Sequence, residues 1–352
     1  MSSGFEYCNP VKINFNFPYK NVLDSLKTDS VLLLTSQSFY KKGLTKILEQ
    51  KLGVRLKGVV YNILSNPEID YAETIKKDYD DYEEIIALGG GSVLDMAKYF
   101  SVSGDITRIG GNLNMPKHCS FRPIYAIPTT AGTSSELTKW ATLWDTPNNI
   151  KFSLSDEKLY CREAFYDPYL FLSIPRELTI YTALDAFSHS IESIWNKNSN
   201  SISINHAIRA IELILEYLPQ LQNDLNSKEL RLKIALASIH AGLAFSNTQT
   251  ALAHAISYPI TMKLGIPHGL ACSFTIPILL ECISDANIDK ILLPYRDKII
   301  SLFRILNIST DLKSYGITKE FVKNIFDNLN SRAKNGMFDL ELTKKKFLFL
   351  TK

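Results

Sequence analysis

The chain has 352 residues, and 45% of them are apolar, so it can bury a large hydrophobic core and is expected to fold as two domains. Its 39 Lys and Arg residues stand against 36 Asp and Glu residues, which leaves a formal net charge of +3 without a long basic block. This balance argues against nucleic acid as the main partner.

Cysteine spacing and hydropathy indicate the compartment. The five cysteines form no Cys-x-x-Cys pair and lie far apart, which predicts reduced thiols. The first residues lack a basic region followed by an apolar one, so no secretory signal is expected. The longest apolar stretch, residues 270–280, is interrupted by Pro277 and is too short to span a bilayer. We therefore expect a soluble cytoplasmic protein without a membrane partner.

In the first half of the chain, short β-branched runs alternate with helical patterns. The predicted strands are 31–34, 58–61, 85–88 and 124–127, and the predicted helices include 40–52 and 71–79. An alternation of strands and helices is typical of a parallel α/β sheet.

In the second half, the pattern changes to long amphipathic segments, and few strand signals remain. These predicted helices are 178–195, 203–217 and 230–245. The change of pattern falls between Cys161 and Pro175. We therefore predict an α/β nucleotide-binding domain over residues 1–165 and an all-helical domain that binds metal and substrate over residues 166–352.

Three glycines, residues 89–91, follow the predicted strand 85–88 and lead directly into a helical pattern. Without Cβ atoms the backbone can approach a pyrophosphate closely, and the N–H groups of the new helix would point at the anion. Ser92 is a plausible N-cap for this helix. The segment is not the G-x-G-x-x-G fingerprint, so the alternative of a simple tight turn stays open.

Small hydroxyl residues follow the strand 124–127, within the segment 127–136. Such a loop can form hydrogen bonds to ribose and phosphate oxygens. The alternative is a Ser/Thr-rich turn that caps a helix near Ser135. Both loops lie at the carboxyl ends of predicted strands, where ligands bind in open α/β sheets, and this shared position favours a cofactor site.

A carboxylate and an imidazole lie four residues apart in a helical pattern, at Asp185 and His189, so both side chains face one way. His254 lies in a later helical segment and His268 in the turn 265–269. One carboxylate and three imidazoles suit Zn²⁺ or Fe²⁺, with open positions left for a substrate oxygen. An Asp/His pair alone is more often an ordinary polar pair, but three of the six histidines fit the same constellation.

Four motifs together resemble the iron-containing (group III) alcohol dehydrogenases over residues 30–275: GGGSVLDMAK, PTTAGTSSE, DAFSH and a histidine pair that ends in PHG. The resemblance implies a Rossmann-like N-terminal domain and a helical metal-binding domain, in a dehydroquinate synthase-like architecture. The implied metal ligands are Asp185, His189, His254 and His268. The implied cofactor residues are Gly90, Gly91, Ser92, Asp95, Thr129, Thr130 and Thr133, with Lys151 as a lysine on the cofactor side.

Within this family, the segments 139–145, 151–154 and 188–196 look most like phosphonoacetaldehyde reductases, which make 2-hydroxyethylphosphonate. A dianionic phosphonate would need cationic or N–H donors near the metal. Lys139, Arg162 and Arg209 are the candidates that the sequence offers for this charge.

Two positions depart from the usual pattern of the family. Many members have a second histidine four residues after the first of the pair, as a candidate for proton relay, and this chain has Tyr258 there. The relay would then use Tyr258 or a chain of water molecules. After the strand 31–34, Ser36 stands where relatives that prefer NAD often have Asp. An acidic residue would bind the ribose 2′-hydroxyl and repel a 2′-phosphate, so its absence favours NADP(H) over NAD(H). The alternative is that Ser36 merely flanks a helix.

The resemblance therefore predicts a metal-dependent NAD(P)H oxidoreductase that reduces a small aldehyde to an alcohol, with phosphonoacetaldehyde as the preferred substrate. One alternative is a general short-chain alcohol dehydrogenase, and another is a dehydroquinate synthase-like lyase. A lyase would show no net oxidation of its cofactor. The expected metal is Fe²⁺ or Zn²⁺, and the family suggests a homodimer or a larger homo-oligomer.

Overall fold

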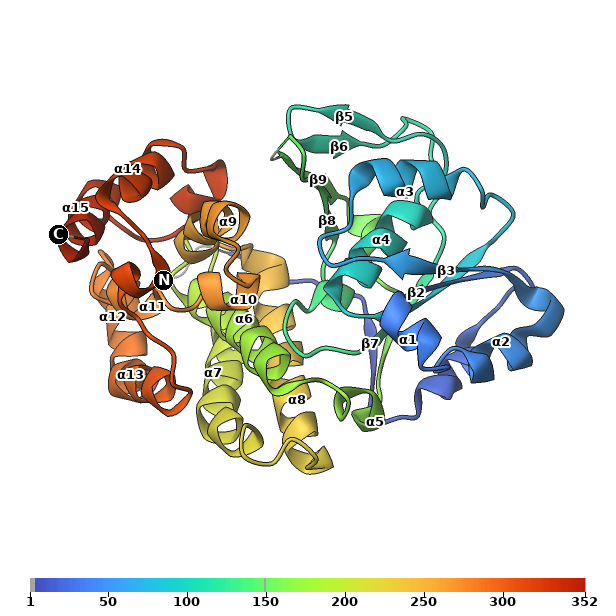
Figure 1. The fold of residues 1–352 in the computed structure, drawn as a ribbon, viewed down its shortest axis with the longest axis horizontal. Coiled ribbons are helices and arrows are strands. Elements are labelled where there is room, and N and C mark those ends of the chain that lie inside the picture. The colour runs from blue at the N-terminus through green and yellow to red at the C-terminus, as the bar shows by residue number, and fades with distance from the viewer. Residues whose placement is uncertain (1–3, 149, 352) are drawn as a thin grey trace. The chain divides into compact units, whose positions relative to one another are not determined.

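A computed structural model describes residues 4–148 and 150–351 of the chain (Figure 1). The chain divides into two compact units. The α/β unit consists of Asn9–Thr130 and Ser134–Phe171, and the helical unit consists of Met1–Cys8, Ala131–Thr133 and Leu172–Lys352. The predicted domain boundary between residues 165 and 166 stays a prediction. No helix among the described residues is both long and apolar enough to cross a membrane.

A six-stranded parallel sheet forms the centre of the α/β unit, with the strand order β1-β10-β7-β4-β2-β3. Its strands are β1 (Lys12–Phe15), β2 (Val31–Ser36), β3 (Leu56–Ile63), β4 (Glu84–Gly89), β7 (Ile124–Pro128) and β10 (Glu163–Tyr166). β2, β4 and β7 are continuous buried apolar runs, as expected for parallel strands covered on both faces. The predicted α/β class with a parallel sheet is confirmed.

Four helices accompany this sheet: α1 (Gln37–Lys41), α2 (Lys46–Leu52), α3 (Ile69–Lys76) and α4 (Gly91–Ser101). The prediction of one helix over 40–52 was wrong. Gly43 has a left-handed φ of 72°, so the backbone leaves the helical conformation between α1 and α2. A short helix, α5 (Pro168–Phe171), ends the unit.

A second, smaller sheet has the strand order β5-β6-β9-β8, and the sequence patterns did not indicate it. Its strands are β5 (Thr107–Ile109), β6 (Asn112–Asn114), β8 (Trp140–Asp145) and β9 (Ile150–Ser155). β8 and β9 pair in antiparallel fashion along their whole length. Two of these strands have only three residues each, which is too short for a periodic signal.

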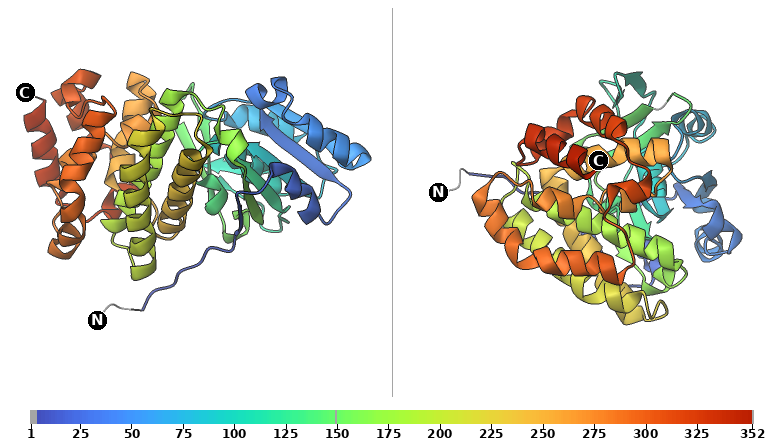
Figure 2. Two further views of the ribbon diagram at one scale, coloured as in Figure 1. Left: turned by 90° about the horizontal axis from the view of Figure 1, so that it is seen from below. Right: turned by 60° about the vertical axis from the view of Figure 1, so that its left-hand side comes forward.

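The helical unit contains helices as its only long elements, which confirms the predicted all-helical second half (Figure 2). Its helices are α6 (Arg176–Ile194), α7 (Ser201–Leu221), α8 (Lys228–Thr248), α9 (Leu252–Leu264), α10 (His268–Ala271), α11 (Ile276–Leu280), α12 (Ala286–Leu292), α13 (Arg296–Ile305), α14 (Lys319–Asp327) and α15 (Leu340–Leu350). Asn200 begins α7 with a capping box, and Ser227 caps α8. α6, α7 and α8 pack together and bury their apolar faces.

Lys98 joins α4 to the segment that follows β7. Its side chain is fully buried, and its ammonium group donates to the carbonyl oxygens of Ser135 (2.6 Å) and Trp140 (2.7 Å). It also donates to the hydroxyls of Ser135 (3.0 Å) and Thr138 (2.9 Å). Burial lowers the pKa of Lys98, and the nearby Asp95 carboxylate opposes that shift. This lysine therefore holds the hydroxyl-rich loop against the glycine-rich helix.

Replacing Lys98 with Met should destabilise the protein by about 3 kcal/mol, because several buried oxygens would lose their donor while the volume changes little. The midpoint of urea unfolding, followed by circular dichroism, measures this loss. Lys76→Met is the matched control, since Lys76 donates only one hydrogen bond, to the Gly104 carbonyl oxygen. Equal midpoints for the two variants would contradict the role of Lys98.

Candidate metal centre and cofactor loops

Helix α6 presents three acidic or imidazole side chains on one face. Asp185, His189 and Glu192 follow each other at spacings of four and three residues, which places them in line along the helix. Their exposed fractions are 4%, 5% and 0%. Buried carboxylates are costly unless they are paired, so this face of α6 requires positive partners.

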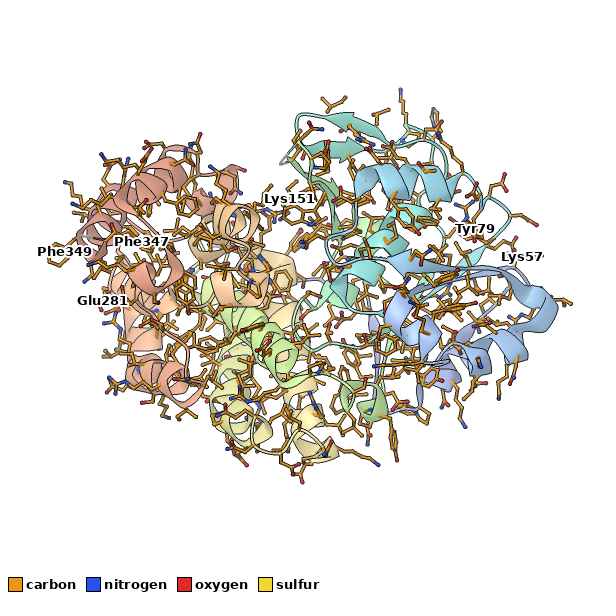
Figure 3. The ribbon with its side chains drawn as sticks, in the orientation of Figure 1. Lys57, Tyr79, Lys151, Glu281, Phe347 and Phe349 are labelled. Carbon is orange, nitrogen blue, oxygen red and sulfur yellow. The ribbon has the colours of Figure 1, made fainter. Side chains whose placement is uncertain are left out.

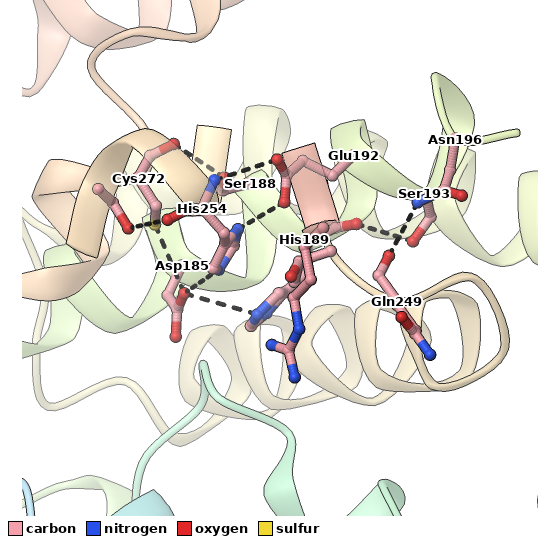
Figure 4. A network of polar contacts seen from close by, with 12 residues as sticks. Asp185, Ser188, His189, Glu192, Ser193, Asn196, Gln249, His254 and Cys272 are labelled. Carbon is pink, nitrogen blue, oxygen red and sulfur yellow. Dashed lines mark hydrogen bonds and ion pairs between the residues drawn. The ribbon is translucent and has the colours of Figure 1, made fainter. Parts of the chain in front are cut away.

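Three imidazoles surround one oxygen atom of Asp185, and Figure 4 shows two of them, those of His189 and His254. The Nε2 atoms of His189, His254 and His268 lie 3.7, 3.3 and 3.9 Å from Asp185 Oδ1. Ligands bonded at about 2.1 Å to one tetrahedral cation stand about 3.4 Å apart. Each of the three imidazole nitrogens therefore lies about as far from Asp185 Oδ1 as two ligands of one divalent cation lie from each other, which supports the predicted metal site.

Glu192 orients one of these imidazoles from behind. Its Oε2 lies 2.6 Å from Nδ1 of His254, and its Oε1 accepts the backbone N–H of His254 at 3.1 Å. With Nδ1–H donated to Glu192, the Nε2 atom of His254 turns toward Asp185. A carboxylate behind a ligating histidine is the arrangement that fixes the tautomer and raises the basicity of metal ligands.

The buried charges of the cluster shift the pKa values of its members in different directions. Burial alone would lower the pKa of His254, but the carboxylates of Glu192 and Asp185 outweigh it and raise the pKa to about 10. His189, whose burial dominates, has a pKa lowered to about 4. Burial opposes ionisation of Asp185, yet the three histidines lower its pKa overall. The two carboxylates thus favour a positive charge at the imidazole of His254, and the donor types, one carboxylate and three imidazoles, suit Fe²⁺ or Zn²⁺.

Close helix packing places His268 beside this group. A Cβ atom at Gly269 would overlap the carbonyl oxygen of Tyr181 and lie 3.2 Å from Cβ of Asp185, so only glycine lets α10 approach α6 this closely. The side chain of His268 is 37% exposed, whereas those of His189 and His254 are 7% and 2% exposed. A substrate oxygen would therefore approach from the side of His268.

Cys272 and Glu192 belong to the centre, and the sequence analysis missed both. Sγ of Cys272 donates to Asp185 Oδ1 at 3.5 Å, and with Asp185, His254 and His268 it offers ligand atoms within 4.8 Å of one another. Both residues had a spacing signal that went unused. Glu192 lies seven residues after Asp185, and Cys272 lies four residues after His268.

Tyr258, the predicted relay residue, lies near the open side of the centre. It is one turn after His254 in α9, and its ring is parallel to that of His268 with 5.9 Å between the centroids. Its hydroxyl accepts a weak hydrogen bond of 3.5 Å from Arg332. The proton-relay role of Tyr258 stays a prediction.

The two predicted cofactor loops meet at the carboxyl ends of β4 and β7. A Cβ atom at Gly90 would lie 3.0 Å from Oγ1 of Thr130, so a side chain at this position would crowd the neighbouring loop. Thr129 is buried and donates its backbone N–H to the Gly89 carbonyl oxygen. Gly91 is the first residue of α4. The start of this helix, where the backbone is only partly buried, suits a phosphate group.

The prediction that Ser92 is the N-cap of this helix was wrong, because Gly90 is the N-cap and Ser92 lies inside the first turn. Its hydroxyl instead accepts the backbone N–H of Asn66 at 3.3 Å. Glycine at the N-cap leaves the approach to the helix N–H groups free of side-chain atoms.

Asp95 joins α4 to the segment that follows β7 and to β8. Its carboxylate accepts the hydroxyl of Ser135 at 2.6 Å and the backbone N–H of Thr142 at 3.0 Å. Burial raises the pKa of Asp95 overall, and Lys98 and, more weakly, Lys151 in β9 oppose that shift; Figure 3 labels the side chain of Lys151. Asp95 therefore supports the loop that would bind the cofactor.

The remaining predicted cofactor residues have these positions. Thr133 belongs to the short segment Ala131–Thr133 of the helical unit. Ser36 ends β2, and its hydroxyl accepts the backbone N–H of Phe39, so it caps α1. This cap matches the alternative interpretation of Ser36 as a residue that flanks a helix. The cofactor roles of these residues stay predictions.

The three residues suggested as cations for a phosphonate, Lys139, Arg162 and Arg209, have contacts or positions that do not indicate a substrate site. Lys139 forms an ion pair with Glu157, and Arg209 forms one with Glu212. Arg162 lines a shallow hollow before β7 and β10, at the amino ends of these strands. The cofactor loops follow the opposite, carboxyl ends of the strands, so none of the three is an obvious substrate cation.

Comparison with known proteins gives matches along most of the chain. The model of the iron-containing alcohol dehydrogenase matches residues 19–168, and the model of the C-terminal part of that family matches residues 179–293. A phosphonoacetaldehyde reductase of Streptomyces viridochromogenes is 35% identical over 56% of this chain, and the match spans 52% of that relative, about half its length. An NAD-dependent methanol dehydrogenase of Bacillus methanolicus is 31% identical over 72% of this chain and 68% of its own.

A solved structure resembles the whole fold. The sulfoacetaldehyde reductase of Bifidobacterium kashiwanohense in complex with NAD⁺ aligns over 100% of both chains with a TM-score of 0.88 and 26% identity. This likeness and the matched models confirm the predicted family resemblance and the α/β fold with a helical C-terminal part.

Replacing His268 with Ala should remove metal from the purified protein, because one of the four converging ligands is lost. Metal content per chain, measured by inductively coupled plasma mass spectrometry after gel filtration, should fall at least about tenfold. His206→Ala is the control, since His206 on α7 pairs with His240 outside the centre. Metal retained at the wild-type level in the His268→Ala variant would refute this ligand.

Proposed function

Because the chain belongs to the iron-containing alcohol dehydrogenase family, we propose that it reduces a small aldehyde to the alcohol with hydride from a nicotinamide cofactor. The observation that carries this proposal is the convergence of three imidazole Nε2 atoms within 3.9 Å of one oxygen of Asp185. Membership of a family of oxidoreductases and this convergence of ligand atoms both support metal-assisted hydride transfer.

Asp185, His189, His254 and His268 would hold the cation, which would act as a Lewis acid toward the carbonyl group when bound. Glu192 keeps His254 in the tautomer that directs Nε2 inward. Phe245 stacks on His189 with 3.9 Å between the ring centroids, and this apolar cover keeps water from that side of the centre. Tyr258 is the proposed source of the proton for the product alcohol, directly or through water.

We propose phosphonoacetaldehyde as the substrate, which gives 2-hydroxyethylphosphonate as product. The 35% identity to a phosphonoacetaldehyde reductase and the residues of segments 139–145, 151–154 and 188–196 support this choice. A general short-chain alcohol dehydrogenase is the alternative, because the methanol dehydrogenase of Bacillus methanolicus is 31% identical. We further propose a cytoplasmic homo-oligomer, as the family suggests.

We propose that the cofactor loops, through Gly90, Gly91, Ser92, Thr129, Thr130 and Thr133, bind the nicotinamide cofactor with support from Asp95 and Lys151. NADP(H) is favoured over NAD(H), because Ser36 at the end of β2 places no negative charge where a 2′-phosphate would lie. The helix cap of Ser36 is compatible with this role, since the small hydroxyl leaves room for the phosphate.

The decisive assay follows NADPH oxidation at 340 nm by protein reconstituted with Fe²⁺ or Zn²⁺. It compares phosphonoacetaldehyde with propanal and lactaldehyde at equal concentrations. The proposal predicts the highest kcat/KM for phosphonoacetaldehyde. Equal or better turnover of the neutral aldehydes would leave a general alcohol dehydrogenase, and no oxidation with any aldehyde would overturn the reductase function.

The Ser36→Asp variant should lower the ratio of kcat/KM for NADPH to that for NADH by about tenfold or more, because a carboxylate would repel the 2′-phosphate. Aspartate is also a good N-cap, so α1 should remain intact. Ser38→Asp is the matched control, since it adds the same charge at an exposed position of the same helix. An unchanged ratio in Ser36→Asp would contradict the NADP(H) preference.

A further inference from the structure

Arg332 is a cation near His268, the most exposed of the proposed metal ligands. Arg332 lies in the 3-10 turn η7 (Ser331–Asn335), and its guanidinium donates to the hydroxyl of Tyr258 at 3.5 Å. The ring of Tyr258 is parallel to that of His268, the ligand with the most exposed side chain. Arg332 is thus linked to the ligand His268 through a single intervening side chain.

The turn that carries Arg332 is firmly attached to the helical unit. Ala333 is fully buried, and the Asn335 side chain donates to the carbonyl oxygen of Thr250, just before α9. The carbonyl oxygen of Asn335 accepts the backbone N–H of Lys197 at 2.8 Å. A cation on such an anchored turn is held ready for a ligand, which reduces the entropy lost on binding.

The charge of Arg332 has no acidic partner among the residues that the structure describes. A guanidinium has five N–H donors, and the long contact to Tyr258 uses one of them. The side chain is half-buried, so it is less hydrated than the neighbouring exposed Lys334. A half-buried arginine without a carboxylate is suited to bind a tetrahedral oxyanion through two parallel hydrogen bonds.

We propose that Arg332 recognises the oxyanion of a two-carbon aldehyde substrate, a phosphonate or a sulfonate, while the aldehyde oxygen faces His268. This inference rests on the proposed reductase function and names the substrate class of the same site. The aldehyde oxygen and the oxyanion of such a molecule lie about 4–5 Å apart, since they are joined by only a few bonds of about 1.5 Å. Such a molecule would extend from His268 past Tyr258 toward Arg332.

The test compares Arg332→Met with wild type on phosphonoacetaldehyde, sulfoacetaldehyde and propanal. The value of kcat/KM for the anionic aldehydes should fall about 100-fold, while that for propanal should change less than about threefold. Arg332→Lys should recover part of the loss, because it keeps the charge without the planar fork. Lys334→Met is the matched control, and it should behave like wild type with all three aldehydes.

A second measurement does not depend on turnover. Isothermal titration calorimetry reports binding of the anion alone. The metal-reconstituted full-length protein is titrated with ethylphosphonate or ethanesulfonate in the presence of NADP⁺. Wild type should bind one of them at least about tenfold more tightly than Arg332→Met does, and the better ligand identifies the natural oxyanion. Equal metal content in both proteins establishes that the centre is intact.

The possible results separate the two proposals. Anion binding that depends on Arg332 without reduction of any aldehyde would support the oxyanion site and overturn the reductase function. Turnover of the anionic aldehydes that survives in Arg332→Met would overturn the oxyanion site and leave the reductase function standing. An equal loss for propanal and for both anionic aldehydes would also overturn it, because Arg332 would then serve only the structure.

Discussion

The short contact between Glu192 and His254 is the interaction on which the rest of the metal centre depends. Both side chains are buried, and 2.6 Å separates Oε2 from Nδ1. A buried carboxylate is unfavourable without a positive partner, so Glu192 binds the imidazole at its back and leaves Nε2 directed at Asp185. Two carboxylates then share one imidazole. The contact with His254 offsets the negative charge of Glu192. The carboxylate of Asp185 keeps its negative charge, and it lies where the three Nε2 atoms converge.

Backbone geometry brings the distant ligands to this point. Gly265, in the left-handed conformation, ends α9, and Pro267 precedes α10, so the chain reverses between His254 and His268. Gly269 then allows the backbone of α10 to contact that of α6. The ligands are therefore fixed by close helix packing, not by flexible loops, which keeps their spacing before a cation binds.

Local spacing made part of this arrangement predictable. The spacing of four residues from Asp185 to His189 indicates a shared helix face, and the buried runs of β2, β4 and β7 indicate a parallel sheet. The neglected signals were also local, since Glu192 continues the same helix face. By contrast, the partners of Lys98 and the nearness of Arg332 to Tyr258 depend on contacts between residues 37 to 74 positions apart. No periodic pattern encodes such contacts, so the sequence could not indicate which cation lies beside the centre.

Arg332 also gives a physical reason for the tyrosine at position 258. Many members of the family have a histidine there, which would gain a positive charge on protonation. A charged imidazole beside the guanidinium of Arg332 would be repelled, and its pKa would fall. A phenol remains neutral, and its oxygen can accept the N–H of Arg332 while its O–H remains a donor. Tyrosine at 258 and arginine at 332 are thus electrostatically compatible where histidine and arginine would compete. The exchange keeps a hydroxyl-bearing ring beside His268 and allows a cation next to it.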